Sequence, residues 1–94
     1  MSNNIKLSAS LLKSIGHPIR IKIILTLADY GEMTVTELTD FLQIDQPVLS
    51  LHLAVLRKIN VILVRKQGKQ SVYSVLDNSV TQAVQIIYYT RSNS

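Results

Sequence analysis

Over the N-terminal two-thirds of the chain, apolar residues recur every three or four positions, the period of an amphipathic α-helix. A first helix is expected to be capped by Ser8 or Ser10 and to end near Gly16. A second begins at Pro18, which suits a first helical turn because its missing N–H would have no partner there, and stops at Gly31. The apolar positions that define these two helices are Leu7, Leu11, Leu12 and Ile15, and then Ile21, Ile24, Leu25 and Ala28.

Two further helices are separated by only three residues, 43–45. Thr34 and Glu37 have the Thr-x-x-Glu spacing of a capping box, which predicts the start of the third helix. Asp45 is a suitable N-cap for the fourth helix, and Pro47 is tolerated in its first turn. The residues expected to face the core are Leu38, Phe41 and Leu42 in the third helix and Leu49, Leu53 and Leu56 in the fourth.

After Asn60 the period changes from that of a helix to that of a strand. Residues 61–66 are β-branched and apolar, residues 67–69 indicate a turn around Gly68, and residues 71–76 resume the strand pattern, which predicts a β-hairpin with a basic tip. Asp77 or Asn78 then caps a last helix. Its apolar positions follow the helical period: Val80, Ala83, Val84, Ile87 and Tyr88.

These elements give a mainly α-helical fold with one β-hairpin, in the order α-α-α-α-β-β-α. The two closely spaced helices followed by a basic hairpin predict a winged helix-turn-helix, in which the hairpin is the wing. Residues 1–94 are expected to form one domain, with frayed ends at about residues 1–5 and 91–94. A chain of 94 residues with 47% hydrophobic content is too short for two independent cores.

Composition narrows the class of protein. The net charge of +4 suits an anionic partner, either a nucleic acid or a membrane surface. The absence of cysteine excludes disulfides, thiolate metal ligands and a thiol redox switch. No segment approaches the ~20 apolar residues of a membrane-spanning helix, and the N-terminus has no apolar signal-peptide core. We therefore expect a cytoplasmic protein that does not bind a membrane.

The charges are segregated along the chain. Five of the six acidic residues fall between positions 29 and 45, whereas residues 46–76 contain five basic residues and no acid. A surface that approaches phosphates has to be free of carboxylates, so this layout favours a nucleic-acid partner. Clustering by chance in a short chain is the alternative.

The fourth helix, from Gln46 to Ile59, is the candidate for the major groove of double-stranded DNA. Gln46 can make a bidentate contact to adenine, and Ser50 can bond to a base or a phosphate. The end of this helix and the hairpin tip carry cations suited to phosphates. The predicted DNA-binding residues are Gln46, Pro47, Ser50, Leu51, His52, Arg57, Lys58, Lys66, Lys69 and Gln70.

Three motifs resemble those of ArsR/SmtB-type bacterial repressors. They are His17-Pro18-Ile19-Arg20, the Ser-x-His-Leu-x-x-Leu-Arg core of residues 50–57, and the wing of residues 65–75. The resemblance implies a homodimeric winged-helix repressor that binds a near-palindromic operator and releases it when an inducer binds. It also implies a dimer interface formed by the first and last helices. The interface residues would be Leu7, Leu11, Val80, Val84, Ile87 and Tyr88.

The chain departs from the family's metal sites. Where many members carry a Cys-x-Cys pair, this chain has Thr34 and Thr36, which cannot supply a thiolate. At a second family site Asp77 aligns, but Ser79 replaces a histidine and no His or Glu follows. We therefore expect no metal and no cofactor, and the inducer is unknown. Leu51 is also unusual, because relatives often place a polar or basic residue there.

Other interpretations remain open at this stage. Nothing in the chain resembles a catalytic grouping or a phosphate-binding loop, so an enzyme is not expected. A winged-helix module that binds proteins and not DNA is the second hypothesis: Leu51 and the low charge content favour it, and the acid-free stretch from Gln46 to Leu76 argues against it. His52 fits a packing or phosphate-orienting role better than metal ligation, and His17 fits a helix cap. The apolar stripe from Val80 to Tyr88 is expected to form an interface, with an effector pocket as the alternative.

Overall fold

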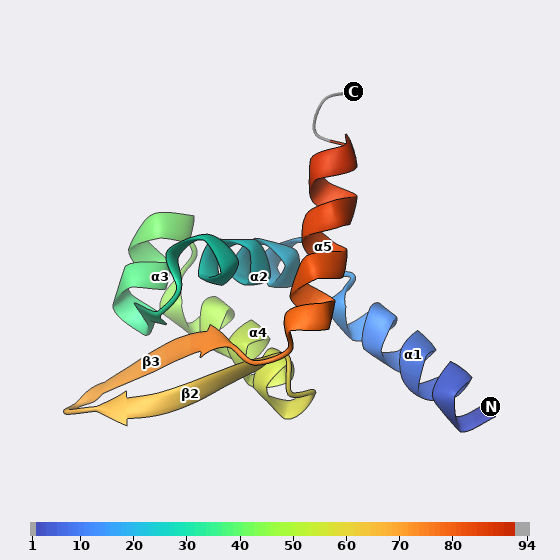
Figure 1. Cartoon of the computed structure of the whole chain (residues 1–94). Helices are drawn as coiled ribbons and strands as arrows, with labels where there is room; N and C mark the ends of the chain where they lie inside the picture. The colour runs from blue at the N-terminus through green and yellow to red at the C-terminus, as the bar shows by residue number, and fades with distance from the viewer. Residues whose placement is uncertain (1, 92–94) are drawn as a thin grey trace.

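The computed structural model describes residues 2–91 (Figure 1). It is mainly helical with a small antiparallel sheet, as predicted, but one short strand interrupts the expected order. The elements are α1 (Ser2–Ile15), α2 (Pro18–Tyr30), β1 (Met33–Thr34), α3 (Val35–Leu42), α4 (Gln46–Lys58), β2 (Ile62–Gln67), β3 (Gln70–Val75) and α5 (Asn78–Arg91).

The additional strand, β1, makes the sheet three-stranded, in the order β1-β3-β2. Its two residues pair with β3, Met33 opposite Tyr73 and Thr34 opposite Val72. The β2–β3 hairpin has a two-residue turn, and Gly68 in that turn has a φ of 64°, a conformation that glycine adopts without steric cost. The strands are displaced by one residue from the predicted ranges of 61–66 and 71–76.

Helix α2 lies at the centre of the molecule and packs against α4, α5 and β3. Burial on several sides explains why its core residues are not the predicted single stripe. Ile23 and Leu27 are fully buried together with the predicted Ile24, whereas Ile21 and Leu25 are only half-buried. In α4 the predicted core residues are confirmed: Leu49, Leu53 and Leu56 are each at most 1% exposed.

The helix starts agree with the sequence signals in part. The Thr34 hydroxyl accepts a hydrogen bond from the Glu37 N–H at 3.1 Å, and the Glu37 carboxylate accepts one from the Thr34 N–H at 2.9 Å, so the capping box is confirmed. The Asp77 carboxylate accepts from the Val80 N–H and caps α5 as predicted. Asp45 occupies the N-cap position of α4 as predicted, but its side chain makes no cap hydrogen bond.

The first and last helices have different bounds from those predicted. Helix α1 begins at Ser2 and not at a Ser8 or Ser10 cap, so the predicted start of this helix is wrong. Helix α5 continues to Arg91, and residues 92–94 lie outside the described residues. Ile5 and Leu7 are exposed, so the apolar residues of the first turns do not mark a buried face from which the start of α1 could be read.

Phe41 is a further correction. It was predicted to face the core, but 53% of it is exposed. Its ring meets that of Tyr30 edge to face, with centroids 5.1 Å apart, at the surface between the ends of α3 and α2. Of the three residues of α3 predicted to face the core, Leu38 is fully buried and Leu42 is half-buried.

Candidate nucleic-acid interface

Helices α3 and α4 and the three residues between them form a helix-turn-helix (Figure 1). Gln43 ends α3 in a left-handed conformation, with a φ of 56°, and its N–H donates to the Thr39 carbonyl at 2.9 Å. This geometry turns the chain sharply enough for α4 to begin at Gln46. Because Leu49, Leu53 and Leu56 anchor one side of α4 in the core, the opposite side faces outward.

The outward face of α4 carries uncharged side chains, most of which are exposed. Leu51 is 69% exposed, and Gln46 and Pro47 are exposed one turn before it. The Gln46 amide donates to the Ser50 hydroxyl at 2.9 Å, which places the two polar side chains together on this face. A helix of 13 residues is about 20 Å long and fits into the major groove of B-DNA.

Val48 was missed by the sequence reasoning. It is 41% exposed and lies three residues before Leu51, so the two apolar side chains share one face of α4. The signal was available in the sequence, since a valine at that helical position falls outside the Leu49, Leu53 and Leu56 stripe. Together Val48 and Leu51 give this face the means to contact thymine methyl groups.

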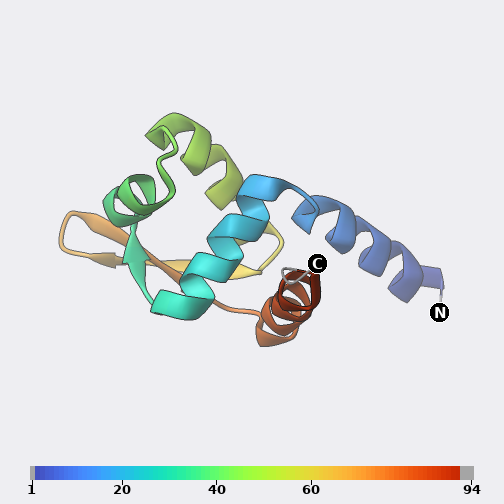
Figure 2. The same ribbon diagram turned by 90° about the horizontal axis from the view of Figure 1, so that it is seen from above.

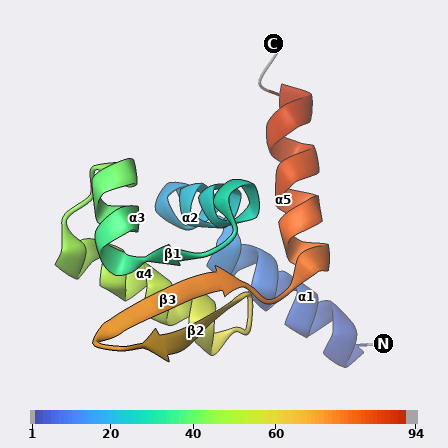
Figure 3. The same ribbon diagram turned by 60° about the vertical axis from the view of Figure 1, so that its left-hand side comes forward.

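Cations flank the outward face at both sides. Arg57 and Lys58 are exposed in the last turn of α4, and Lys66 and Lys69 are exposed at the hairpin tip. The Lys66 ammonium donates to the Ser71 hydroxyl across the hairpin at 3.1 Å. Helix α4 and strand β2 pack together, so the hairpin lies beside α4, as Figure 3 shows.

One basic residue of the hairpin differs from these. Arg65 forms an ion pair with Glu32 at 2.5 Å, where both side chains are about half exposed. Its charge is therefore already balanced by a carboxylate of the same chain. Gln70, one of the predicted DNA-binding residues, is exposed beside the hairpin turn.

His52 is positioned differently from the other predicted DNA-binding residues. It is half-buried, and its Nδ1 accepts a hydrogen bond from Arg20 Nε at 3.2 Å. Its ring lies against that of His17, with centroids 4.4 Å apart. Burial, followed by the nearby charges of His17 and Arg20, lowers the pKa of His52. These contacts fit the packing role that the sequence suggested.

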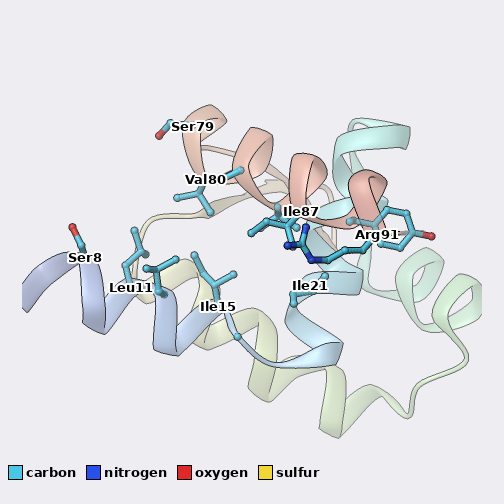
Figure 4. A pocket seen from close by; sticks show the side chains of 13 residues that line it. Ser8, Leu11, Ile15, Ile21, Ser79, Val80, Ile87 and Arg91 are labelled. Carbon is cyan, nitrogen blue, oxygen red and sulfur yellow. The ribbon is translucent and has the colours of Figure 1, made fainter. Parts of the chain in front are cut away.

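A second surface feature is an apolar groove of about 680 Å³ between α1 and α5. Figure 4 shows Leu11 and Ile15 of α1 on one wall and Val80 and Ile87 of α5 on the other. Five of the six predicted interface residues line it. Those five are Leu11, Val80, Val84, Ile87 and Tyr88, whereas Leu7 is not part of the lining.

The predicted interface residues differ in how much of their surface is exposed: two are buried and three are about half exposed or more. Val80 and Val84 are 9% and 8% exposed, so they already belong to the core of one protomer. Ile87 and Tyr88 are 56% and 48% exposed, and Leu7 is 68% exposed. Ile87, Tyr88 and Leu7 therefore keep about half or more of their surface uncovered by the chain itself.

The residues at the family's metal positions have structural contacts. Thr34 caps α3, and the Ser79 hydroxyl donates to the Asp77 carboxylate at 2.7 Å. The hydrogen bonds from Ser79 and then Val80 lower the pKa of Asp77, against a smaller opposing effect of burial. Between residues 2 and 91, no three His, Asp or Glu side chains converge on a point where a metal ion would fit. No helix in the same range is long and apolar enough to cross a membrane.

A helix-turn-helix with an adjacent hairpin, a carboxylate-free outer helix and flanking cations defines a winged-helix DNA-binding transcriptional regulator. Residues 17–63, half of the chain, match the family described as "Bacterial regulatory protein, arsR family". The chain belongs to this family, and the regulators that it resembles are not enzymes.

Curated relatives and solved structures agree with this assignment. An uncharacterized HTH-type transcriptional regulator, MJ1325 of Methanocaldococcus jannaschii, is 32% identical over 85% of this chain and 90% of its own length. The biofilm growth-associated repressor of Xylella fastidiosa is 38% identical over 85% of this chain and 69% of its own. The crystal structure of the repressor BigR from Xylella fastidiosa matches with a TM-score of 0.86 and 34% identity, over 97% of this chain and 92% of that one. HlyU from Vibrio cholerae matches with a TM-score of 0.87 and 28% identity, over 97% and 98%.

Proposed function

We propose that this protein is a homodimeric, sequence-specific repressor that reads double-stranded DNA with α4 and holds it with the wing. The observation that carries the proposal is the outward face of α4, which is exposed, free of carboxylates and flanked by cations on its last turn and on the hairpin tip. Gln46 and Ser50 are suited to hydrogen bonds with base edges. Leu51 is suited to apolar contact with thymine.

The dimer is proposed from the apolar groove. A chain of this size buries only roughly 60–70% of its unfolded surface, so covering further apolar area would add stability. A second copy related by a twofold axis would cover Ile87 and Tyr88 of both subunits. The two copies of α4 would then lie about 34 Å apart, which places them in successive major grooves on one side of the DNA.

Regulation is proposed to be independent of the family's usual metal sites. Thr34 and Ser79 cannot replace the cysteine and histidine ligands of those sites, since Thr34 caps α3 and the Ser79 hydroxyl donates to the carboxylate of Asp77. An inducer, whatever its chemistry, would act by favouring a dimer in which the two recognition helices are wrongly spaced. By linkage, that inducer would weaken DNA binding by the same factor by which DNA weakens its own binding.

Titration with random-sequence duplex DNA at several salt concentrations tests the DNA-binding proposal. Arg57, Lys58, Lys66 and Lys69 supply eight cations in a dimer, so the slope of log K against log salt should be about −7. Lys69→Glu should weaken binding to all sequences and reduce that slope by about 2, because two phosphate contacts are lost.

Lys6→Glu is the matched control. It changes the net charge equally but lies in α1, whose free end and the hairpin tip are at opposite ends of the molecule (Figures 1 and 2). Its salt slope should equal that of the wild type. Binding that is absent or insensitive to salt would contradict DNA recognition and favour a protein-interaction module that uses the exposed Val48 and Leu51.

A further inference from the structure

One guanidinium joins three helices beneath the proposed DNA-binding surface. Arg20, in the first turn of α2, donates from Nη1 to the Ser14 carbonyl of α1 at 2.6 Å. It also donates from Nε to His52 Nδ1 of α4 at 3.2 Å. These two hydrogen bonds, called the Arg20 bridge below, connect α1 to α4 through a half-buried side chain.

The bridge requires this pair of side chains. A guanidinium holds its donors in a rigid planar fork that can serve two separate acceptors at once, whereas the three donors of a lysine ammonium all leave one nitrogen atom at the end of a flexible chain. On the other side, His52 Nδ1 can accept only when it carries no proton. The ring of His17 packs against His52 at 4.4 Å, and the Nδ1 of His17 accepts from the Ile19 N–H, which holds this histidine pair in place.

Each end of the bridge leads to a different surface. Ser14 lies in the last turn of α1, where backbone carbonyls have no partner within the helix, and Arg20 satisfies its carbonyl. The next residue, Ile15, lines the apolar groove (Figure 4). At the other end, His52 follows Leu51, the most exposed large apolar side chain on the outward face of α4.

We propose that Arg20 is a positioning residue for sequence-specific DNA binding. It acts through His52 to fix α4 relative to α1, and so it fixes the position of the outward face of α4 relative to the apolar groove between α1 and α5. The inference rests on the proposed function. Non-specific attraction to phosphates depends on surface cations and tolerates a small displacement of α4, whereas bidentate base contacts do not. Loss of the bridge should therefore reduce specificity more than general affinity.

The experiment compares two duplexes, one of random sequence and one selected from a random pool by the wild-type protein. The ratio of the two dissociation constants is measured for the wild type and for Arg20→Lys, which keeps the charge but not the planar set of donors on separate nitrogen atoms. It is also measured for His52→Leu, which removes the acceptor, and for the double variant. A hydrogen bond to a charged donor predicts about a tenfold fall in the ratio for each single variant.

His52→Asn is the matched control, because its side-chain oxygen can occupy the position of Nδ1 and accept from Arg20. It should retain most of the specificity ratio. The double variant should be no worse than either single variant, since both remove the same bridge. Thermal unfolding of each variant separates positioning from folding, and the His52→Leu and His52→Asn pair keeps the test valid should Arg20→Lys fail to fold.

Three results would overturn the inference: an unchanged ratio in His52→Leu, additive losses in the double variant, or equal losses in His52→Asn and His52→Leu. Each of these results counts against the inference only when the wild-type protein binds DNA in the same assay. A wild type that binds neither duplex at any salt concentration would instead refute the proposed function, and the inference with it.

Discussion

Replacing Ile87 by alanine tests the proposed dimer without damaging the protomer. Ile87 lines the apolar groove and is 56% exposed, so its side chain contributes little to the core of one chain. Val84 is a poorer target because it is only 8% exposed, and its loss would destabilise the fold itself. Ile87→Ala therefore changes the surface that a partner would cover and leaves the remaining groove intact.

The expected magnitude follows from the exposed area. Shortening isoleucine to alanine removes three carbon groups, worth about 2.4 kcal/mol on full burial at about 0.8 kcal/mol each. Because roughly half of Ile87 is left for the partner to bury, about 1.3 kcal/mol is lost per subunit. A twofold axis brings in both copies, so the dimer loses about 2.7 kcal/mol, or about 100-fold in its dissociation constant.

Sedimentation equilibrium over a wide concentration range measures this constant, and circular dichroism checks that the protomer stays folded. Ile86→Ala is the control, since Ile86 is 63% exposed on the same helix but does not line the groove. It should dissociate like the wild type. The reasoning is refuted if Ile87→Ala stays as tightly dimeric as the wild type, or if Ile86→Ala weakens the dimer equally.

Three further outcomes are expected. Gln46→Ala should change the preference at one base position by roughly 1–3 kcal/mol in a selection from random duplexes, and an unaltered preference would show that Gln46 does not read a base. Asp77→Ala should lower the free energy of unfolding by about 0.5–2 kcal/mol through loss of the α5 cap, and unchanged stability in urea would contradict this. Acid should destabilise the wild type in two stages. The pKa of His52 is lowered in the folded state, so the unfolded state takes up a proton first and stability falls as the pH drops below the ordinary histidine pKa of about 6.5. The pKa of Asp77 is also lowered, so stability falls further at lower pH, where its carboxylate is protonated. Melting temperatures across this range check both stages, and a His52→Asn variant with an undiminished first stage would assign it elsewhere.

Local signals predicted most of the architecture because they act over a few residues. The capping box at Thr34 and Glu37, the stop at Gly31 and the change of period after Asn60 are each visible in the sequence, and each marks a real boundary. The helical period of the apolar residues in α4 likewise predicted both its buried leucines and its outward face. That face is the part of the candidate site that sequence alone could place.

Features that depend on distant partners were missed. Strand β1 contains only Met33 and Thr34, and it is a strand only because β3, far along the chain, pairs with it. Phe41 fits the helical pattern of core residues, but the rest of the chain buries only the side of α3 that carries Leu38 and leaves Phe41 half exposed. The Arg20 bridge joins residues 32 positions apart, so the motif containing Arg20 was recognisable while its contact with His52 was not.

Disulfide trapping on DNA tests most directly whether α4 enters the major groove. Because the chain contains no cysteine, Leu51→Cys introduces a unique thiol on the outward face of α4, and Gln82→Cys introduces one on the exposed surface of α5. Each variant is incubated with duplexes that carry a thiol tether on one base in the major groove. The account predicts adducts with Leu51→Cys at two positions about 10 base pairs apart and none with Gln82→Cys. Adducts with Gln82→Cys and none with Leu51→Cys would contradict it.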